Sequence, residues 1–328
     1  MPRWRRPATW LWAVLALPLL ALALAAVLAT VLALGSANWA RAPLEQLVQL
    51  RTGRALHIDG DLHLQPGWPL LGVQVQGLRF ANPGWARQPQ LLAIDRADAQ
   101  LDLRALLRGR LLLPQVQVGR PVVLLERAAD GRKSWLLDRA QADAGSAVQI
   151  GSLTLREGTL GYDDPRDGTA LRLVLDATGR GAGAAGAPQP GPTSALGGPG
   201  DVLYSASGTL RGQPVQLRGR GGAALGLHGD GAPYPLVLEG QVGSTTLRAD
   251  GRVTGLARLT AVDVRLALRG DNLARLGALL GLGLPQTPAY AGSGRLLHQG
   301  SRWQYQGFSG QVGRSDVAGN LTLDLDGP

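Results

Sequence analysis

Apolar and polar residues alternate with a period of two over much of the chain beyond residue 55. Such alternation is typical of a strand with one apolar and one polar face. The clearest runs are Val73/Val75, Leu101/Leu103, Val116/Val118, Leu153/Leu155, Leu171/Leu173/Leu175, Val262/Val264/Leu266/Leu268 and Leu321/Leu323/Leu325. Because helical segments between these runs are missing, we predict a mainly β fold whose antiparallel sheet is solvated on one side.

Two segments depart from the alternation and predict short helices, near residues 42–52 and 271–282. The first is expected to be amphipathic and to end near Gly53. In the second, leucines at helical spacing share one face, and Asp271 or Asn272 can cap its start.

Two further segments are predicted to lack regular structure. Residues 106–110 read as a short turn between strands, and residues 179–200 are rich in Gly, Ala and Pro. The second segment cannot bury a core, so we expect a flexible surface loop or insertion. It divides the body into β-regions over residues 35–178 and 201–328.

One stretch of 25 residues without charge, Trp10 to Leu34, is long enough to cross a membrane as a helix. At about 1.5 Å per residue it reaches roughly 37 Å, against a hydrocarbon core of about 30 Å. The residues that flank it as charges or interfacial aromatics are Arg3, Arg5, Arg6, Trp10, Trp12 and Trp39. The positive-inside rule then predicts a cytoplasmic tail over residues 1–9, an anchor over 10–34 and a body on the far side.

A cleaved signal peptide is the competing interpretation, because Gly35, Ser36 and Ala37 are small residues at a suitable cleavage position. The apolar stretch is longer than the usual signal-peptide core of about 7–15 residues. We therefore favour a retained anchor, and either interpretation exports the body.

Composition narrows the chemistry that the body can perform. The net charge of +9 comes almost wholly from arginines scattered singly along the chain, which does not form the basic stripe of a nucleic-acid-binding protein. The chain has no cysteine, which excludes disulfides, thiolate nucleophiles and zinc–thiolate sites.

Two patterns resemble binding motifs, and neither predicts a site. Gly181, Gly183 and Gly186 form a GxGxxG, but prolines follow where a dinucleotide site needs a helix. His57 and His63 could share a strand face with Asp59 and Asp61 as metal ligands, yet Gly60-Asp61 more simply marks a turn that breaks the register. We expect no cofactor, no metal site and no enzymatic activity.

Several short motifs, in order after the predicted anchor, resemble the AsmA family of Gram-negative envelope proteins. They are Thr52-Gly53-Arg54, Asp59-Gly60-Asp61-Leu62, Leu78-Arg79-Phe80-Ala81-Asn82-Pro83-Gly84-Trp85, Leu103-Arg104-Ala105-Leu106-Leu107-Arg108-Gly109, Pro121-Val122-Val123-Leu124-Leu125-Glu126, Asp130-Gly131-Arg132-Lys133-Ser134-Trp135, Leu284-Pro285-Gln286-Thr287-Pro288-Ala289-Tyr290 and Val312-Gly313-Arg314-Ser315-Asp316-Val317-Ala318-Gly319. Ser134 replaces the asparagine usual in the family at that position.

The resemblance implies a single-pass protein of the bacterial inner membrane that projects into the periplasm, similar to the TamB relatives and bridge-like lipid-transfer proteins. In such proteins the sheet curls into a taco-like groove, along which phospholipid acyl chains are thought to slide toward the outer membrane. The resemblance also allows a second role, as an assembly factor or scaffold for outer-membrane proteins.

The alternation alone leaves two arrangements open for the apolar sheet face, an open groove or a closed sandwich. The resemblance favours the groove, whose partners would be membrane lipids. Its expected lining residues are Leu62, Leu64, Val73, Val75, Leu101, Leu103, Val116, Val118, Leu153, Leu155, Leu171, Leu173 and Leu175. Because the chain stops at Pro328, directly after an alternating strand, we expect it to be the N-terminal portion of a longer protein.

Overall fold

The computed structural model describes residues 36–108, 110–137, 148–155, 157–176, 201–222, 224–226, 233–255 and 260–324. The predicted anchor, its flanking residues Arg3, Arg5, Arg6, Trp10 and Trp12, and the predicted loop over 179–200 lie outside these ranges. Within them, no helix combines the length and the apolar character that crossing a bilayer requires.

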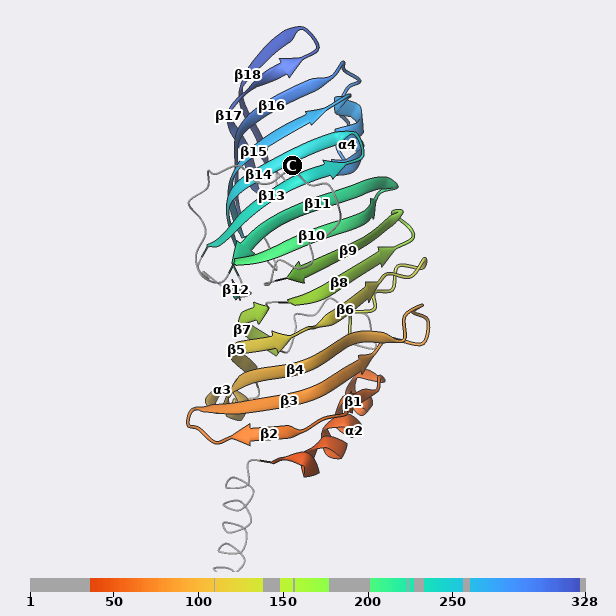
Figure 1. Cartoon of the computed structure of the whole chain (residues 1–328), viewed down its shortest axis with the longest axis vertical. Coiled ribbons are helices and arrows are strands. Elements are labelled where there is room, and N and C mark those ends of the chain that lie inside the picture. Colours follow the sequence, from red (N-terminus) through yellow and green to blue (C-terminus); the bar gives the residue numbers. More distant parts are fainter. Residues whose placement is uncertain are drawn as a thin grey trace, which may run out of the picture.

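Eighteen strands of the described ranges join in one long sheet, stacked along the long axis of the molecule (Figure 1). The first nine are β1 (Leu56–Ile58), β2 (Leu62–Gln65), β3 (Leu70–Ala81), β4 (Gln90–Asp102), β5 (Leu111–Gly119), β6 (Val122–Glu126), β7 (Val148–Leu155), β8 (Glu157–Asp164) and β9 (Thr169–Asp176). The others are β10 (Asp201–Leu210), β11 (Gln213–Gly222), β12 (Ala224–Gly226), β13 (Tyr234–Val242), β14 (Thr245–Thr254), β15 (Ala261–Gly270), β16 (Tyr290–Gln299), β17 (Arg302–Val312) and β18 (Ser315–Asp324). The mainly β prediction is confirmed.

Both predicted helices are present. A short 3-10 turn, η1 (Asn38–Ala40), leads into α2 (Arg41–Thr52), which stops at Gly53 in the left-handed conformation with φ of 71°. In α4 (Leu273–Leu280), the Asn272 side chain accepts a hydrogen bond of 2.8 Å from the backbone N–H of Ala274. The cap is therefore Asn272 rather than Asp271.

The segment after β4 differs from its prediction. The alternation predicts Leu103 on a strand and a turn over residues 106–110, but Leu103–Leu107 form a helix, α3. The side chain of Asp102 accepts hydrogen bonds from the N–H groups of Arg104 and Ala105, at 2.8 and 3.0 Å, and so starts the helix there.

The sheet is mixed rather than wholly antiparallel, which corrects the predicted strand arrangement. Most neighbours are antiparallel, but β5 pairs with β7, and β6 with β8, in parallel. The connection over residues 127–147 is long enough for the crossover that parallel strands need, roughly a dozen residues or more. Side-chain alternation does not depend on strand direction, so the sequence pattern could not show which strands pair in parallel.

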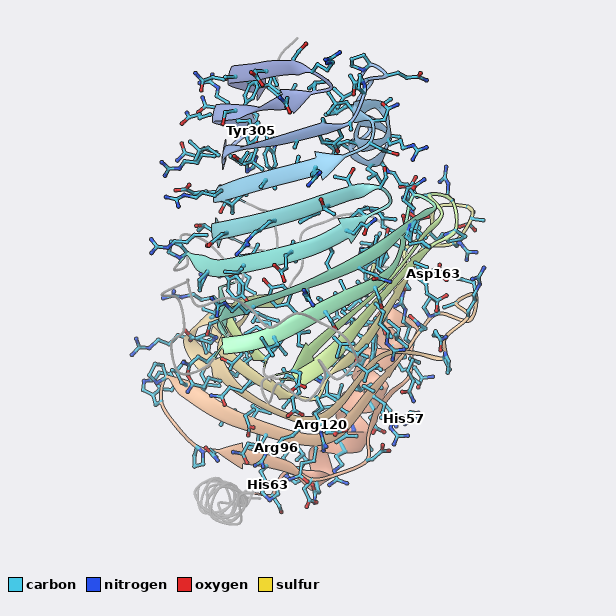
Figure 2. All side chains as sticks on the ribbon, turned by 45° about the horizontal axis from the view of Figure 1, so that its top comes forward. His57, His63, Arg96, Arg120, Asp163 and Tyr305 are labelled. Carbon is cyan, nitrogen blue, oxygen red and sulfur yellow. The ribbon has the colours of Figure 1, made fainter. Side chains whose placement is uncertain are left out.

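The predicted β-regions on either side of residues 177–200 belong to the same sheet, since β9 pairs directly with β10. On one side of the sheet, however, β12 pairs with β7 and bypasses both β9 and β10. The sheet is curved, as seen in Figure 2.

The buried core is small for a sheet of this size. Its cluster consists of Val253, Val262 and Val264, against which Leu236, Leu296 and Trp303 pack. The described strands form one continuous sheet and not two separate ones.

Candidate functional site

A continuous apolar surface crosses the sheet from β8 to β18. Residues directly opposite each other on neighbouring strands lie on the same face, so the strand registers trace this surface. We call it the apolar band, and its residues are Leu160, Leu171, Leu173, Leu175, Ala206, Leu217, Leu238, Leu247, Ala249, Leu266, Leu268, Leu296, Tyr305, Leu321 and Leu323. Most are only half-buried, whereas the buried Val253, Val262 and Val264 of the core cluster lie on the same face.

The opposite face of these strands is polar and exposed. Arg218 forms an ion pair of 3.0 Å with Glu239, and Arg295 forms one of 2.7 Å with Asp263. The hydrogen bond from Arg295 lowers the pKa of the Asp263 carboxyl below its usual value. The sheet therefore has one face suited to water and one suited to an apolar ligand.

Tyrosine rings cover glycines on the face of the band. Tyr204 lies opposite Gly219, where a Cβ atom would come within 2.5 Å of the tyrosine ring. Its hydroxyl donates to the carbonyl oxygens of Arg220 and Val237, at 2.9 and 3.0 Å. Burial raises the pKa of the Tyr204 hydroxyl, so it stays a neutral donor.

The same arrangement recurs along the sheet. Tyr290 covers Gly270, and Tyr305 covers Gly294 and donates to the carbonyl oxygen of Leu266 at 3.0 Å. Figure 2 labels Tyr305. The alternation of apolar residues did not predict these tyrosines. A signal was present in β11, where glycines alternate with Arg218 and Arg220 and so occupy the apolar face of the strand.

The predicted lining residues divide into two sets. Leu171, Leu173 and Leu175 lie in β9 on the apolar band. A second set, which we call the basal set, shares one face near β2, and comprises Leu62, Leu64, Val73, Val75, Leu101, Val116, Val118, Leu153 and Leu155. Leu103 belongs to neither set, because it lies on α3.

The alternation shifts by one residue between the basal set and the apolar band. Leu92 of β4 pairs with Val123, which pairs with Leu160 of the band. The basal set connects to β4 through Ala97 and Ala99. Between these positions, the consecutive residues Asp95 and Arg96 are both exposed, so the parity of the residue numbers does not assign the two sets to different faces.

A line of interruptions crosses the strands where the alternation shifts. Residues 59–61 separate β1 from β2, Gly77 has φ of 64°, and Arg120, between β5 and β6, has φ of 49°. Arg120 pairs with Asp95 at 2.8 Å, and Arg79 with Asp59 at 2.9 Å. Figure 2 shows Arg96 and Arg120 at this end of the molecule.

The four residues considered as metal ligands do not converge. The register does break at residues 59–61, but by a one-residue shift between β1 and β2, which both pair with β3, and not by the predicted turn. Asp61 accepts from Arg41 at 3.0 Å. Over the described residues, no group of three His, Cys, Asp or Glu side chains is placed to hold a metal ion.

The motif around Ser134 has a structural role at the base of the sheet. Ser134 is fully buried, and its hydroxyl accepts from the N–H of Glu126 at 2.9 Å. The buried guanidinium of Arg54, just after α2, donates to the carbonyl oxygens of Ser134 and Leu136. Burial lowers the pKa of Arg54. The motif thus ties the end of α2 to β6.

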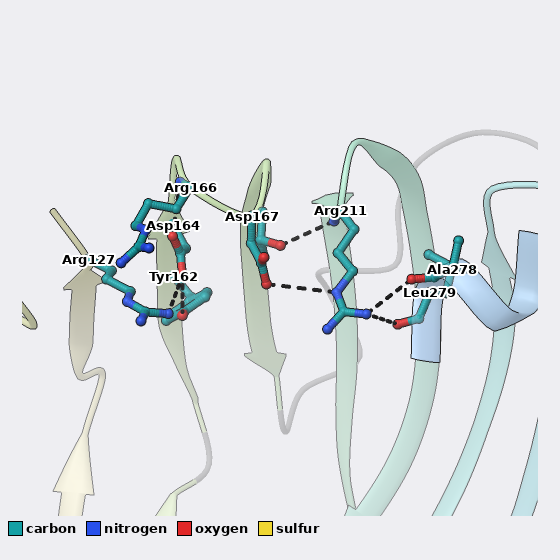
Figure 3. Close-up of polar contacts among 9 residues, drawn as sticks. Arg127, Tyr162, Asp164, Arg166, Asp167, Arg211, Ala278 and Leu279 are labelled. Atoms are coloured by element: carbon teal, nitrogen blue, oxygen red, sulfur yellow. Dashed lines mark hydrogen bonds and ion pairs between the residues drawn. The ribbon is translucent and has the colours of Figure 1, made fainter. Parts of the chain in front are cut away.

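A second polar cluster lies along one rim of the sheet (Figure 3). The buried carboxylate of Asp164 accepts from Arg127 at 3.1 Å, from the Tyr162 hydroxyl at 3.3 Å and from the N–H of Arg166 at 3.1 Å. Burial opposes its ionisation, but the bonds from Arg127 and Arg166 outweigh this and lower its pKa.

Arg211 lies on the same rim and holds the C-terminus of α4. It donates through Nη1 to the carbonyl oxygens of Ala278 and Leu279, at 3.0 and 3.1 Å (Figure 3). Within the described residues, neither rim cluster pairs a nucleophile with a base, and the buried Nε of Arg127 has no hydrogen-bond partner.

Fold and site together define an elongated, single-sheet β protein with one long apolar surface. The sequence matches the model of the AsmA family over residues 9–316, so the chain belongs to the AsmA family. It is similar to the AsmA family protein YhjG of Escherichia coli (strain K12), with 26% identity over 326 residues, covering 89% of this chain and 46% of that relative. The chain thus spans about half the length of the curated relative it matches.

Proposed function

We propose that this chain is a cell-envelope protein, anchored in the bacterial inner membrane by residues 10–34, whose sheet extends into the periplasm. In this proposal the apolar band binds phospholipid acyl chains and conducts them between the inner and outer membranes. The observation that carries it is the band itself, an apolar surface shared by neighbouring strands from β8 to β18 and left half-exposed. Membership of the AsmA family supports a place in the envelope.

The chemistry of the band suits an acyl chain better than a polar ligand. Leucine and alanine side chains offer apolar contact without direction, so a bound chain can shift along the band without breaking specific bonds. Burial of one methylene contributes about 0.8 kcal/mol, so about ten buried methylenes would contribute roughly 8 kcal/mol. The tyrosine hydroxyls bond to the backbone and need no partner from the ligand.

Photo-crosslinking tests this proposal. A photoreactive residue at Leu173 or Leu266, on the band, should label phospholipid in cells. The same residue at Ser205 or Arg265, on the polar face of β10 and β15, should label little. Equal labelling of both faces, or a band free of lipid by mass spectrometry, would contradict the proposal.

A second candidate function is an assembly factor for outer-membrane proteins. The observation that favours it is β18, whose ten residues are all exposed and which, within the described part of the chain, pairs with β17. An exposed strand edge can accept another extended chain. Crosslinks from Val317 to unfolded outer-membrane proteins, without lipid labelling at Leu173, would favour this role over lipid binding.

A further inference from the structure

The helix α2 presents leucines outward rather than toward the sheet. The exposed fractions of Leu44, Leu47 and Leu50 are 39%, 53% and 76%. At about 100° per residue, a spacing of three places them along one arc of roughly 120°. Trp39, just before the helix, is 65% exposed.

The other side of α2 is occupied by the protein. The carboxylate of Glu45 accepts a hydrogen bond of 2.9 Å from the N–H of Ile58 in β1. Val48 and Thr52 are half-buried on the same side of the helix. The outward leucines are therefore available for contact with another surface.

The chain just before α2 is fixed to the sheet. Ser36 forms a β-bridge with His63, and the N–H of Ala37, which is fully buried, donates to the carbonyl oxygen of Leu62 at 2.7 Å. The side chain of Asn38 accepts from the N–H of Leu62 at 2.9 Å. Ser36 is therefore held directly against β2, without a flexible linker between them.

This attachment sets how far α2 can lie from the apolar stretch. Leu34 is two residues before Ser36, and two residues span at most about 7 Å. If residues 10–34 cross the membrane, the base of the sheet is held at its surface. In Figure 1, α2 lies at the end of the molecule where the described chain begins.

We propose that α2 is an interfacial helix that lies on the membrane, with Trp39, Leu44, Leu47 and Leu50 inserted among the lipids. The inference rests on the anchor of the proposed function and adds a second membrane contact. Interfacial helices bury their apolar face to a depth of roughly 5–10 Å. Exposed Arg51, in the last turn, adds charge suited to anionic headgroups. Anchor and helix together would fix the orientation of the sheet on the membrane.

A single-cysteine experiment tests this inference, since the natural chain has no cysteine. The full chain carrying Leu47→Cys or Leu50→Cys is labelled with an environment-sensitive fluorophore and reconstituted in phosphatidylcholine–phosphatidylglycerol vesicles. Brominated lipids should quench the label by about half at these sites, which lie within the depth of an interfacial helix. Gln49→Cys, exposed on the other flank of α2, is the matched control and should be quenched much less.

The possible outcomes test the interfacial helix separately from the transmembrane anchor and from lipid binding by the apolar band. Ala25→Cys reports the anchor, and quenching there without quenching at Leu47→Cys overturns the interfacial helix alone. A blue-shifted label at Leu47→Cys that brominated lipid does not quench indicates a protein partner, which also overturns it. Crosslinking from Leu173 continues to test the band independently.

Discussion

At the scale of single residues, the apolar band depends on glycines that leave room for aromatic rings. Gly219 faces the ring of Tyr204, whose hydroxyl bonds to two carbonyl oxygens. The Tyr204 ring fills the space that a side chain at Gly219 would take. The Tyr204 hydroxyl finds its hydrogen-bond partners within the sheet. A smooth apolar surface is therefore obtained without an unpaired hydroxyl on it.

Gly219→Ala should destabilise the sheet around β10 and β11. Its Cβ would collide with the Tyr204 ring and with the backbone of β13, and such overpacking costs about 1–3 kcal/mol. Urea unfolding of the two proteins measures the loss. Gly283→Ala is the matched control, because a Cβ there meets nothing within 4 Å. An unchanged midpoint for Gly219→Ala would show that the ring is free to move.

Asp164 should make the rim sensitive to acid. Its folded pKa lies below the unfolded value of about 3.9. The stabilisation that the Asp164 carboxylate contributes is therefore complete above its unfolded pKa. It is lost as the pH falls through its folded pKa. Asp164→Asn should cost about 1–3 kcal/mol at pH 7, and the two proteins should converge in acid.

Unfolding measured between pH 7 and pH 3 checks this behaviour. Asp163→Asn is the control, since that exposed carboxylate pairs with Arg87 at 3.2 Å and should contribute at most about 1 kcal/mol. A constant difference between Asp164→Asn and the natural chain at all pH values would contradict the assignment.

At the scale of elements, local sequence signals predicted what local interactions determine. α2 and α4 were predictable because a left-handed Gly53 and an Asn272 cap mark their ends. α3 was missed because Leu101 and Leu103 also fit a strand, and the Asp102 cap interrupts that pattern. The parallel pairings were missed because strand direction depends on contacts between distant residues.

The contact between Arg211 and α4 allows a test at this scale. Arg211 and Gly212 form the β10–β11 turn with φ of 50° and 75°, a conformation that Asn-Gly adopts readily. Arg211→Asn should keep the hairpin and remove the bonds to the carbonyls of Ala278 and Leu279.

The C-terminal amides of α4 should then exchange about fivefold faster, corresponding to about 1 kcal/mol. Hydrogen exchange followed by mass spectrometry measures this change. Asn272→Ala removes the cap at the other end and should accelerate exchange there instead. Faster exchange within β10 and β11 would show that Arg211 also supports the hairpin.

At the scale of the whole molecule, the sequence predicted that each strand has an apolar face but not how the strands align. In β4 the apolar positions change from even numbers, Leu92 and Ile94, to odd numbers, Ala97, Ala99 and Leu101. The registers place this change level with Gly77 and Arg120, whose positive φ interrupts the alternation of the neighbouring strands. The alignment of these interruptions depends on pairing between distant residues, so the sequence pattern alone could not locate it.

The long band allows a test that distinguishes conduction from static binding. Leu238 lies in β13, between Leu173 in β9 and Leu321 in β18. An ionised carboxylate in an apolar path costs more than the roughly 1.4 kcal/mol that a tenfold change represents. If acyl chains move along the band from the base, Leu238→Asp should reduce lipid crosslinking from Leu321 about tenfold and leave crosslinking from Leu173 unchanged.

Val237→Asp is the matched control for this test, because Val237 is the neighbour of Leu238 in β13 and lies opposite Asp250 on the polar face. It places the same charge in the same strand without entering the band. Equal crosslinking from Leu321 in both variants would mean that lipids reach β18 by another route. A loss at Leu173 as well would mean that the band binds lipid as one unit and does not conduct it stepwise from the base.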